Sequence, residues 1–230
     1  MAAWGVGVLI LLGAGWQGGA VLAAFFVSST LISKATAGRA AAMLDAKGNT
    51  RDAWQVLANG GVAAVASVAA PTGSLLGLWL VTASLAAAAS DTWGTSVGAL
   101  SSVPPRLWWS GRRVVPGTNG GVSPIGSGGA IVGGAIVSVT AAAVAGLAWL
   151  APAGTLIGFA GMLLDSLVGG TVQGRFHCPS CDQPSEWRMH RCGSATRQTG
   201  GVAWLNNDAV NAIATLGAAG LAWMVWRWHD

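Results

Sequence analysis

Long apolar runs alternate with polar connections along the 230 residues of this chain. A helix that crosses the hydrocarbon core of a bilayer needs about 20 predominantly apolar residues. The pattern predicts seven helices, the first of them short: Ala2–Gly13, Gly18–Ser33, Gln55–Ala70, Ser74–Trp93, Gly128–Ala151, Ala153–Val172 and Asp208–Trp226. Three connections are short and contain Gly or Pro, which predicts tight turns: Gly13–Gln17, Pro71–Gly73 and Ala151–Ala153. Three others are long and polar: Lys34–Trp54, Gly94–Ser127 and Gln173–Asn207.

The basic residues are confined to the long connections, with Arg227 as the one exception among 12. By the positive-inside rule these connections are cytoplasmic, so the chain begins inside and ends outside. Only 9% of the residues are charged and 53% are hydrophobic, which excludes an ordinary soluble domain. We therefore expect an all-α fold, a polytopic transmembrane bundle of about six to seven helices. It forms one membrane domain over residues 1–230 in a bacterial inner (plasma) membrane, with no nucleic-acid partner.

Three aspartates lie at the cytoplasmic ends of predicted helices. Asp91 and Asp165 come near the ends of two helices that run inward, and Asp208 begins the last helix. Ionisable groups in hydrocarbon are costly and mark functional sites. Two pairs of amides are spaced four residues apart and so share a helix face: Gln55 with Asn59, and Asn207 with Asn211. They lie in the same layer as the aspartates, and Lys34, Arg51 and Asp52 border that layer. Each residue also has a structural reading: a helix cap for Asp208, an arginine partner for Asp165, interhelical hydrogen bonds for the amides. Their convergence on one side favours a site at the inner leaflet.

The segment from Arg112 to Ser123 combines cations, glycines and hydroxyls. Successive backbone N–H groups in such a loop can bind an anion, and arginine suits phosphate. The loop also leads into a helix whose N-terminus attracts anions. An ordinary cytoplasmic loop with inside-positive charge explains the segment equally well. The spacing of a P-loop or of a dinucleotide fingerprint is absent from the sequence.

All three cysteines lie in the last long connection. Cys178 and Cys181 form a Cys-x-x-Cys pair, and His190 and Cys192 follow as His-x-Cys. Four such ligands complete a tetrahedral Zn²⁺ shell, so the metal is structural and clips a cytoplasmic loop over residues 173–207. His177 is the substitute ligand. The alternative is three reduced cysteines without metal.

The chain resembles a widespread family of integral membrane proteins that includes the plant chloroplast phytyl-phosphate kinase. The resemblance covers most of the chain and rests on these segments: Phe26–Leu31, Ala53–Ala64, Ser90–Thr95, Gly117–Ser123, Gly170–Gln173 and Leu205–Asn211. The pattern Asp91-x-x-Gly94-x-x-x-Gly98 is also similar to a motif of membrane phytol and dolichol kinases. The cysteine loop is not needed in the plant-type members.

The resemblance implies a kinase that transfers a phosphoryl group from a nucleoside triphosphate (CTP or another) to a membrane isoprenoid monophosphate. Such chemistry depends on positioning and on Mg²⁺. Its Mg²⁺ ligands would be Asp91, Asp165 and Asp208, and its other catalytic residues Lys34, Arg51 and Arg112 beside Asp91. Its substrate-binding residues would be Ser29, Gln55, Asn59, Thr92, Thr95, Asn119, Gly120, Gly121, Ser123, Gln173, Asn206, Asn207 and Asn211. The isoprenoid tail stays in the bilayer.

Three other functions compete with the kinase. Another lipid head-group transferase, such as a cytidylyltransferase, would use similar metal and phosphate groups. A transporter of an ion or a phosphorylated lipid would need polar residues through the outer half of the bundle, where the sequence has few. A scaffold with a zinc-clipped docking loop would leave the intramembrane acids unexplained.

Overall fold

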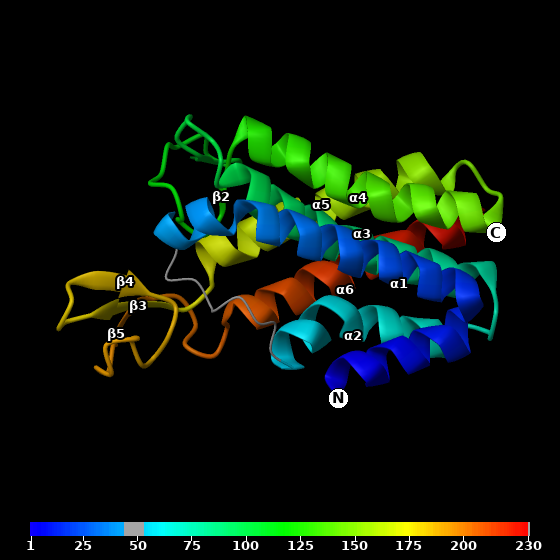
Figure 1. Ribbon diagram of the computed structural model, residues 1–230, viewed down its shortest axis with the longest axis horizontal. Helices are drawn as coiled ribbons and strands as arrows, with labels where there is room; N and C mark the ends of the chain where they lie inside the picture. The colour runs from blue at the N-terminus through cyan, green and yellow to red at the C-terminus, as the bar shows by residue number, and fades with distance from the viewer. Residues whose placement is uncertain (44–52, 230) are drawn as a thin grey trace.

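The computed structural model describes residues 1–43 and 53–229 and shows a bundle of long helices with a small sheet at one end (Figure 1). The helices are α1 (Ala2–Met43), α2 (Ala53–Ala69), α3 (Leu75–Gly98), α4 (Pro124–Ala145), α5 (Leu150–Thr171) and α6 (Asn207–His229). The strands are β1 (Arg106–Leu107), β2 (Gly121–Val122), β3 (Arg175–Cys178), β4 (Gln183–Ser185) and β5 (Arg197–Gly200). The predicted all-α membrane class is confirmed.

Five of these helices are long and apolar enough to cross a membrane, within the residues that the structure covers. Their ranges are Ala2–Gly38, Leu75–Gly98, Pro124–Ala145, Leu150–Thr171 and Asn207–Trp228. The remaining helix, Ala53–Ala69, is apolar but shorter, with 17 residues. The six helices correspond to the seven predicted spans because α1 contains the first two.

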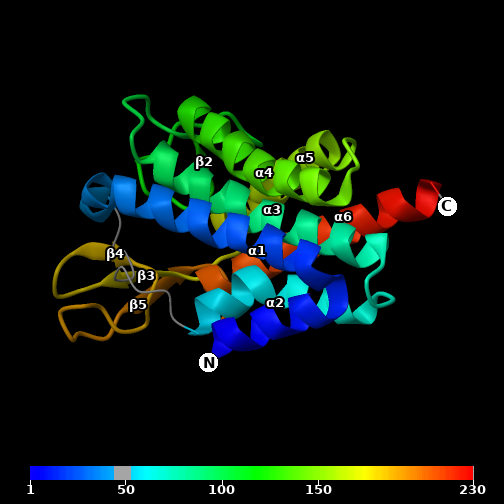
Figure 2. The ribbon, with the colours of Figure 1, turned by 45° about the vertical axis from the view of Figure 1, so that its right-hand side comes forward.

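Helix α1 bends sharply where the sequence predicts its first turn. Gly15 has φ 65° and ψ −163°, which a residue with a side chain rarely adopts. The amino-terminal arm therefore folds back beside the rest of α1 (Figures 1 and 2). The bend is held against the turn between α2 and α3, where Gly73 N–H donates to the carbonyl oxygen of Gly13 at 2.8 Å.

Helix α3 is the centre of the bundle. It packs against each of the other five helices, which contact one another in the closed order α1, α2, α6, α5, α4 and back to α1. Its run from Val81 to Ser90 is buried without interruption. An Ala-rich helix suits this place, since small side chains let neighbouring membrane helices approach closely.

The contact between α3 and α4 depends on glycines of α4. A β-carbon on Gly133 would lie 2.6 Å from Cγ of Trp93 and 2.7 Å from the carbonyl oxygen of Ala89. A β-carbon on Gly129 would lie 2.9 Å from the carbonyl oxygen of Trp93. The two backbones are therefore nearly in contact, which draws the part of α3 that carries Asp91 into the bundle.

The predicted boundary between the fourth and fifth long spans was wrong. Helix α4 ends at Ala145, where Gly146 takes a left-handed conformation with φ 68°, and α5 already begins at Leu150. Pro152 thus lies in the first turn of a helix, where proline is tolerated because those N–H groups have no intrahelical acceptor. Helix α3 also continues past the predicted end at Trp93 to Gly98, so Asp91 lies inside it.

The long connections meet at one end of the bundle, which we call the loop end. The segment 99–123, with the hairpin β1–β2, and the segment 172–206, with the sheet β4-β3-β5, both lie there (Figure 1). The bend of α1 and the turns 70–74 and 146–149 lie at the opposite end. The carboxyl terminus is also at that opposite end, whereas the chain starts nearer the loop end (Figures 1 and 2).

Candidate functional site

Two half-buried carboxylates, Asp91 of α3 and Asp165 of α5, lie toward the loop end and interact electrostatically. Asp165 interacts electrostatically with Asp91 and also with Glu186 from the segment after β4. Oδ2 of Asp165 is shielded from solvent and has no hydrogen-bond partner among the described residues. Nor does a basic side chain from residues 1–43 or 53–229 act on Asp91 or Asp165. Two neighbouring carboxylates such as Asp91 and Asp165 are costly in an apolar bundle, and a bound cation would offset that cost.

Glu186 is a member of this group that sequence reasoning missed. Its Oε1 accepts a hydrogen bond of 3.4 Å from Nε2 of Gln173, which is only 2% exposed. Gln173 lies two residues after the end of α5, the helix that carries Asp165. The one signal in the sequence is that Glu186 is the single glutamate of the chain.

Asp208 is not among the acids that act on Asp165 in the described part of the chain. It lies in the first turn of α6, beside Trp54 and Leu57 of α2. The sequence also predicted that Asp208 could cap the helix. Asn206 caps it instead, because its Oδ1 accepts a hydrogen bond from the N–H of Ala209 at 3.0 Å. All three aspartates lie toward the loop end, with Asp208 at the contact between α2 and α6.

The predicted amides are used in different ways. Nδ2 of Asn59 donates to the carbonyl oxygen of Gln55 at 3.0 Å, a bond within its own helix. Asn211 is 6% exposed, and its Oδ1 has no partner in the described structure. Asn207 is exposed at the start of α6. Only Asn211 therefore keeps a buried polar atom available for a further ligand.

The glycine-rich loop is packed against α5 one residue beyond Asp165. Oγ of Ser166 donates to the carbonyl oxygen of Gly120 at 2.8 Å. Gly120 has φ 82°, and a β-carbon there would lie 2.6 Å from the carbonyl oxygen of Ser166 and 2.7 Å from Cα of Gly170. Ser123 caps α4 by accepting from the N–H of Gly126 at 3.1 Å. Close packing of the loop on α5 accounts for the glycine at position 120. An anion-binding loop would not need this packing.

The other predicted site residues are scattered around this group. Gly121 pairs with Leu107 in the β1–β2 hairpin, and Asn119 is half-buried beside it. Thr92 donates to the carbonyl oxygen of Ala88 at 2.9 Å, which satisfies its hydroxyl within α3. Among the remaining predicted residues, Ser29 is fully buried, whereas Lys34, Thr95 and Arg112 are exposed. Arg51 and Asp52 lie outside the described residues.

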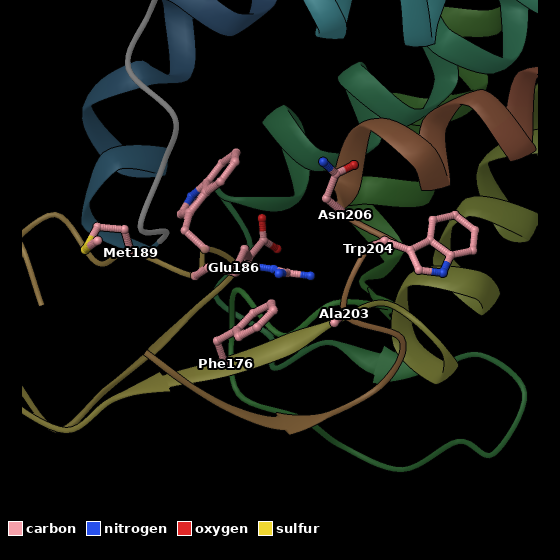
Figure 3. Close-up of a pocket in the computed structure, with 8 residues that line it drawn as sticks. Phe176, Glu186, Met189, Ala203, Trp204 and Asn206 are labelled. Atoms are coloured by element: carbon pink, nitrogen blue, oxygen red, sulfur yellow. The ribbon is translucent and has the colours of Figure 1, made fainter. Parts of the chain in front are cut away.

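Two adjoining cavities open beside the acids. The first, of about 450 Å³, lies against Phe176, Glu186 and Arg188, and the second, of about 540 Å³, against Trp54, Leu57 and Asp208. Both are lined by Trp187 and Asn206, so they are neighbours. Figure 3 shows the carboxylate of Glu186 between the ring of Phe176 and the amide of Asn206. The first cavity carries the charged side chains Glu186 and Arg188 among apolar residues, and the second lies between α2 and α6.

Three cysteines and a histidine form a compact cluster on the sheet β4-β3-β5. The ligand atoms of Cys178, Cys181, His190 and Cys192 all lie within 4.8 Å of one another. Sγ of Cys178 is 3.6 Å from Sγ of Cys192, and Nδ1 of His190 is 3.1 Å from the same sulfur. Two sulfurs on one tetrahedral zinc, with Zn–S bonds of about 2.3 Å, lie roughly 3.8 Å apart. The donor set and its spacing therefore fit a metal such as zinc.

The protonation of the thiols also suits a metal. Hydrogen bonds from Ser194 and His190 lower the pKa of Cys192 to about 5, so this residue is a thiolate at neutral pH. The hydrogen bond with Cys192 raises the pKa of Cys181 to about 11, so Cys181 keeps its proton until a metal displaces it. Asp182, with φ 53°, and Gly193, with φ 84°, reverse the chain directly after each ligand pair.

The structure distinguishes the two histidines that could complete the shell. His190 is 4% exposed and lies in the cluster, whereas Nε2 of His177 is 3.2 Å from Oδ1 of Asp182. We expect His190→Gln to lower the zinc content of the purified protein at least ~10-fold, and His177→Gln to leave it unchanged. Elemental analysis by mass spectrometry measures both. Equal zinc in the two variants would show that the cluster is not the zinc site.

The comparisons with known proteins agree on one family. Residues 1–219 match the family described as integral membrane protein DUF92. The chain is 30% identical to Protein PGR of Arabidopsis thaliana over 88% of this chain and 79% of that protein. It is also 30% identical to an uncharacterized membrane protein of Methanocaldococcus jannaschii, over 73% of this chain and 70% of the relative. No solved structure matches it. The family resemblance of the sequence motifs is thus confirmed, and the chain belongs to the DUF92 family of integral membrane proteins.

Proposed function

We propose that this protein is a membrane lipid-phosphate kinase that transfers a phosphoryl group from a nucleoside triphosphate to an isoprenoid monophosphate. The observation that supports it most is the pair of half-buried carboxylates Asp91 and Asp165, which interact electrostatically and on which no basic side chain of the described residues acts. Carboxylates combined with substrate phosphates are the ligands that Mg²⁺ prefers. Such a group at the end of a membrane bundle suits a lipid whose phosphate lies at the bilayer surface.

The chemistry requires little beyond positioning and charge neutralisation. A phosphate oxygen of the lipid attacks the γ-phosphorus, and the bond from that phosphorus to the β–γ bridging oxygen breaks. The nucleoside diphosphate leaves with the electron pair. The attacking oxygen is already anionic, so the site needs no strong base. A bound Mg²⁺ would neutralise charge on the transferring group, and Asp91 and Asp165 would hold it.

Basic side chains at the loop end would bind the remaining phosphate oxygens. Sequence reasoning assigns this role to Lys34, Arg51 and Arg112. The structure adds Arg188, which lines the same cavity as Glu186. Because Arg112 and Arg188 lie on connections rather than inside the bundle, we infer that the nucleotide approaches from the aqueous side of the loop end, which is the cytoplasmic side by the positive-inside rule.

The second cavity supplies a place for the lipid chain. Trp54, Leu57 and Ala58 of α2 line it together with Ala209 and Ala212 of α6. An isoprenoid chain in this apolar region would place its phosphate near the polar residues that the two cavities share. Asp208 then lies beside the lipid phosphate, separate from the cation held by Asp91 and Asp165.

A lipid-product assay on detergent-purified, zinc-loaded protein tests this proposal. The protein is given Mg²⁺, each of the four nucleoside triphosphates in turn, and phytyl, geranylgeranyl or farnesyl monophosphate. We expect a lipid diphosphate in the mass spectrum. A nucleotide-linked lipid would instead assign the protein to the head-group transferases. The absence of any lipid product would contradict both and make transport the function to test.

A further inference from the structure

Two arginines in the connection between α3 and α4 lie directly opposite one another. Arg106 forms an antiparallel bridge with Arg113. On either side of the bridge, the N–H of Leu107 donates to the residue before Arg113 and the N–H of Val114 donates to the residue before Arg106, each at 2.9 Å. These bonds define a non-hydrogen-bonded pair, in which the two Cα atoms are about 4.5 Å apart and both side chains leave the same face. The two arginines therefore stand side by side.

The arginine pair is on the outer face of this connection. Side chains alternate along a strand, so Leu107 points away from the pair, and it is only 6% exposed. Arg106 and Arg113 are both exposed. Nη1 of Arg106 donates to the carbonyl oxygen of Gly111 at 2.8 Å, which holds this side chain in place. The two guanidinium groups thus present their other N–H donors outward, away from the bundle.

The pair has no counter-charge in the part of the chain that the structure describes. Like charges directly opposite one another destabilise a strand pair. The sequence contains no acidic residue between Asp91 and Asp165, and no acid from residues 1–43 or 53–229 forms an ion pair with Arg106 or Arg113. The positive-inside rule explains basic connections in general, but it does not explain two arginines held at adjacent positions of one ladder. Their arrangement favours a bound anion.

Trp108 places this face of the connection at the edge of the bilayer. Its Nε1 donates at 3.2 Å to the carbonyl oxygen of Leu163, which lies about 12 Å before the end of α5 at 1.5 Å per residue. The indole is nevertheless 46% exposed, and Val103 and Val115 beside the arginine pair are exposed as well. Tryptophan prefers the headgroup level of a bilayer. The pair is therefore close to lipid headgroups, with apolar side chains next to it.

We propose that Arg106 and Arg113 bind the phosphate of an anionic membrane phospholipid in the leaflet at the loop end. Arginine presents its donors in a planar fork that suits phosphate, and a phosphate between two guanidinium groups accepts from both. The acyl chains of the same lipid lie against Trp108 and Val115, which a free phosphate ion would leave uncovered. Neither arginine has a role in the proposed function, so this lipid site stands independently of it.

The test titrates the full chain in detergent with phosphatidylglycerol, and native mass spectrometry counts the bound lipid. The wild type is expected to bind it more tightly than phosphatidylcholine with the same acyl chains. Arg106→Gln/Arg113→Gln is expected to bind phosphatidylglycerol about 30-fold more weakly, which is about 2 kcal/mol, or about 1 kcal/mol per arginine. Arg175→Gln/Arg197→Gln is the matched control, because it removes two exposed arginines from the sheet at the same end of the bundle. It should leave the affinity unchanged.

A third variant separates the geometry of the arginines from their charge. Arg106→Lys/Arg113→Lys keeps both charges but replaces each planar fork by a point charge. Its affinity for phosphatidylglycerol is expected to lie between those of the wild type and the glutamine variant. Monodisperse elution and circular dichroism show that each variant is folded. If the glutamine variant does not fold, the lysine variant and the preference of the wild type for the anionic lipid decide the question.

Three results would overturn this assignment. An equal loss of affinity in Arg175→Gln/Arg197→Gln would mean that the lipid is attracted by overall charge and not by the pair. Equal affinity of the wild type for phosphatidylglycerol and phosphatidylcholine would mean that no anionic headgroup is recognised. Unchanged lipid binding in Arg106→Gln/Arg113→Gln, together with the loss of bound inorganic phosphate, would assign the pair to a free phosphate ion.

Discussion

An Asp91→Asn variant is expected to lose more than about 100-fold in the rate of lipid diphosphate formation. The amide keeps the shape of the carboxylate but removes the charge that would bind Mg²⁺. A metal ion contributes several kcal/mol of charge stabilisation to phosphoryl transfer, and each 1.36 kcal/mol is about tenfold in rate. Asp91 is in the central helix α3 and interacts electrostatically with Asp165. The rate is measured by mass spectrometry of the lipid product at saturating nucleotide.

Two further variants show whether the loss is specific. Asp182→Asn removes an exposed acid on the sheet that carries the cysteine–histidine cluster and should keep the full rate. Asp208→Asn should lose less than Asp91→Asn, because Asp208 is not among the acids that act on Asp165 in the described structure. If Asp91→Asn and Asp208→Asn lose the same activity, all three predicted aspartates act as one group. If Asp91→Asn is fully active, the cation site is elsewhere.

Gly133→Leu is expected to lower the thermal midpoint of the detergent-purified protein by roughly 2–12 °C. Even a β-carbon at this position would lie 2.6 Å from Cγ of Trp93 and 2.7 Å from the backbone oxygen of Ala89. The four added carbons must therefore push α4 away from α3. Overpacking of this kind costs about 1–3 kcal/mol, and a protein of this size loses about 2–4 °C per kcal/mol. The midpoint is the temperature at which half of the monodisperse protein is lost on heating, as detected by fluorescence.

Gly128→Leu is the matched control on the same helix. No atom lies within 4 Å of a β-carbon built on Gly128, which is exposed on the outer face of α4. The substitution adds a strong helix former and should leave the midpoint unchanged or raise it slightly. Equal destabilisation by the two variants would mean that the α3–α4 contact does not depend on the absence of side chains from α4.

Local patterns in the sequence were sufficient to predict the membrane spans and the cysteine–histidine cluster. A bilayer demands about 20 apolar residues per helix and internal hydrogen bonds throughout, so spans can be predicted from composition alone. The bend at Gly15 was predicted from a short glycine-containing gap between two apolar runs. Cys178, Cys181, His190 and Cys192 lie within 15 residues of sequence, and spacing alone brings such ligands together.

Contacts between distant segments could be found only in the tertiary structure. The ring of helices around α3 follows from how small residues match across helix surfaces, which apolar patterns do not encode. Glu186 acts on Asp165 from the segment after β4, and no periodicity in the sequence links those positions. The same folding places Asp208 beside α2 and leaves Asn206 to cap α6. The sequence by itself thus determined which residues lie at the loop end, because helix direction and charge are local properties. Only the tertiary structure decided which of them meet, because helix rotation and packing set those distances.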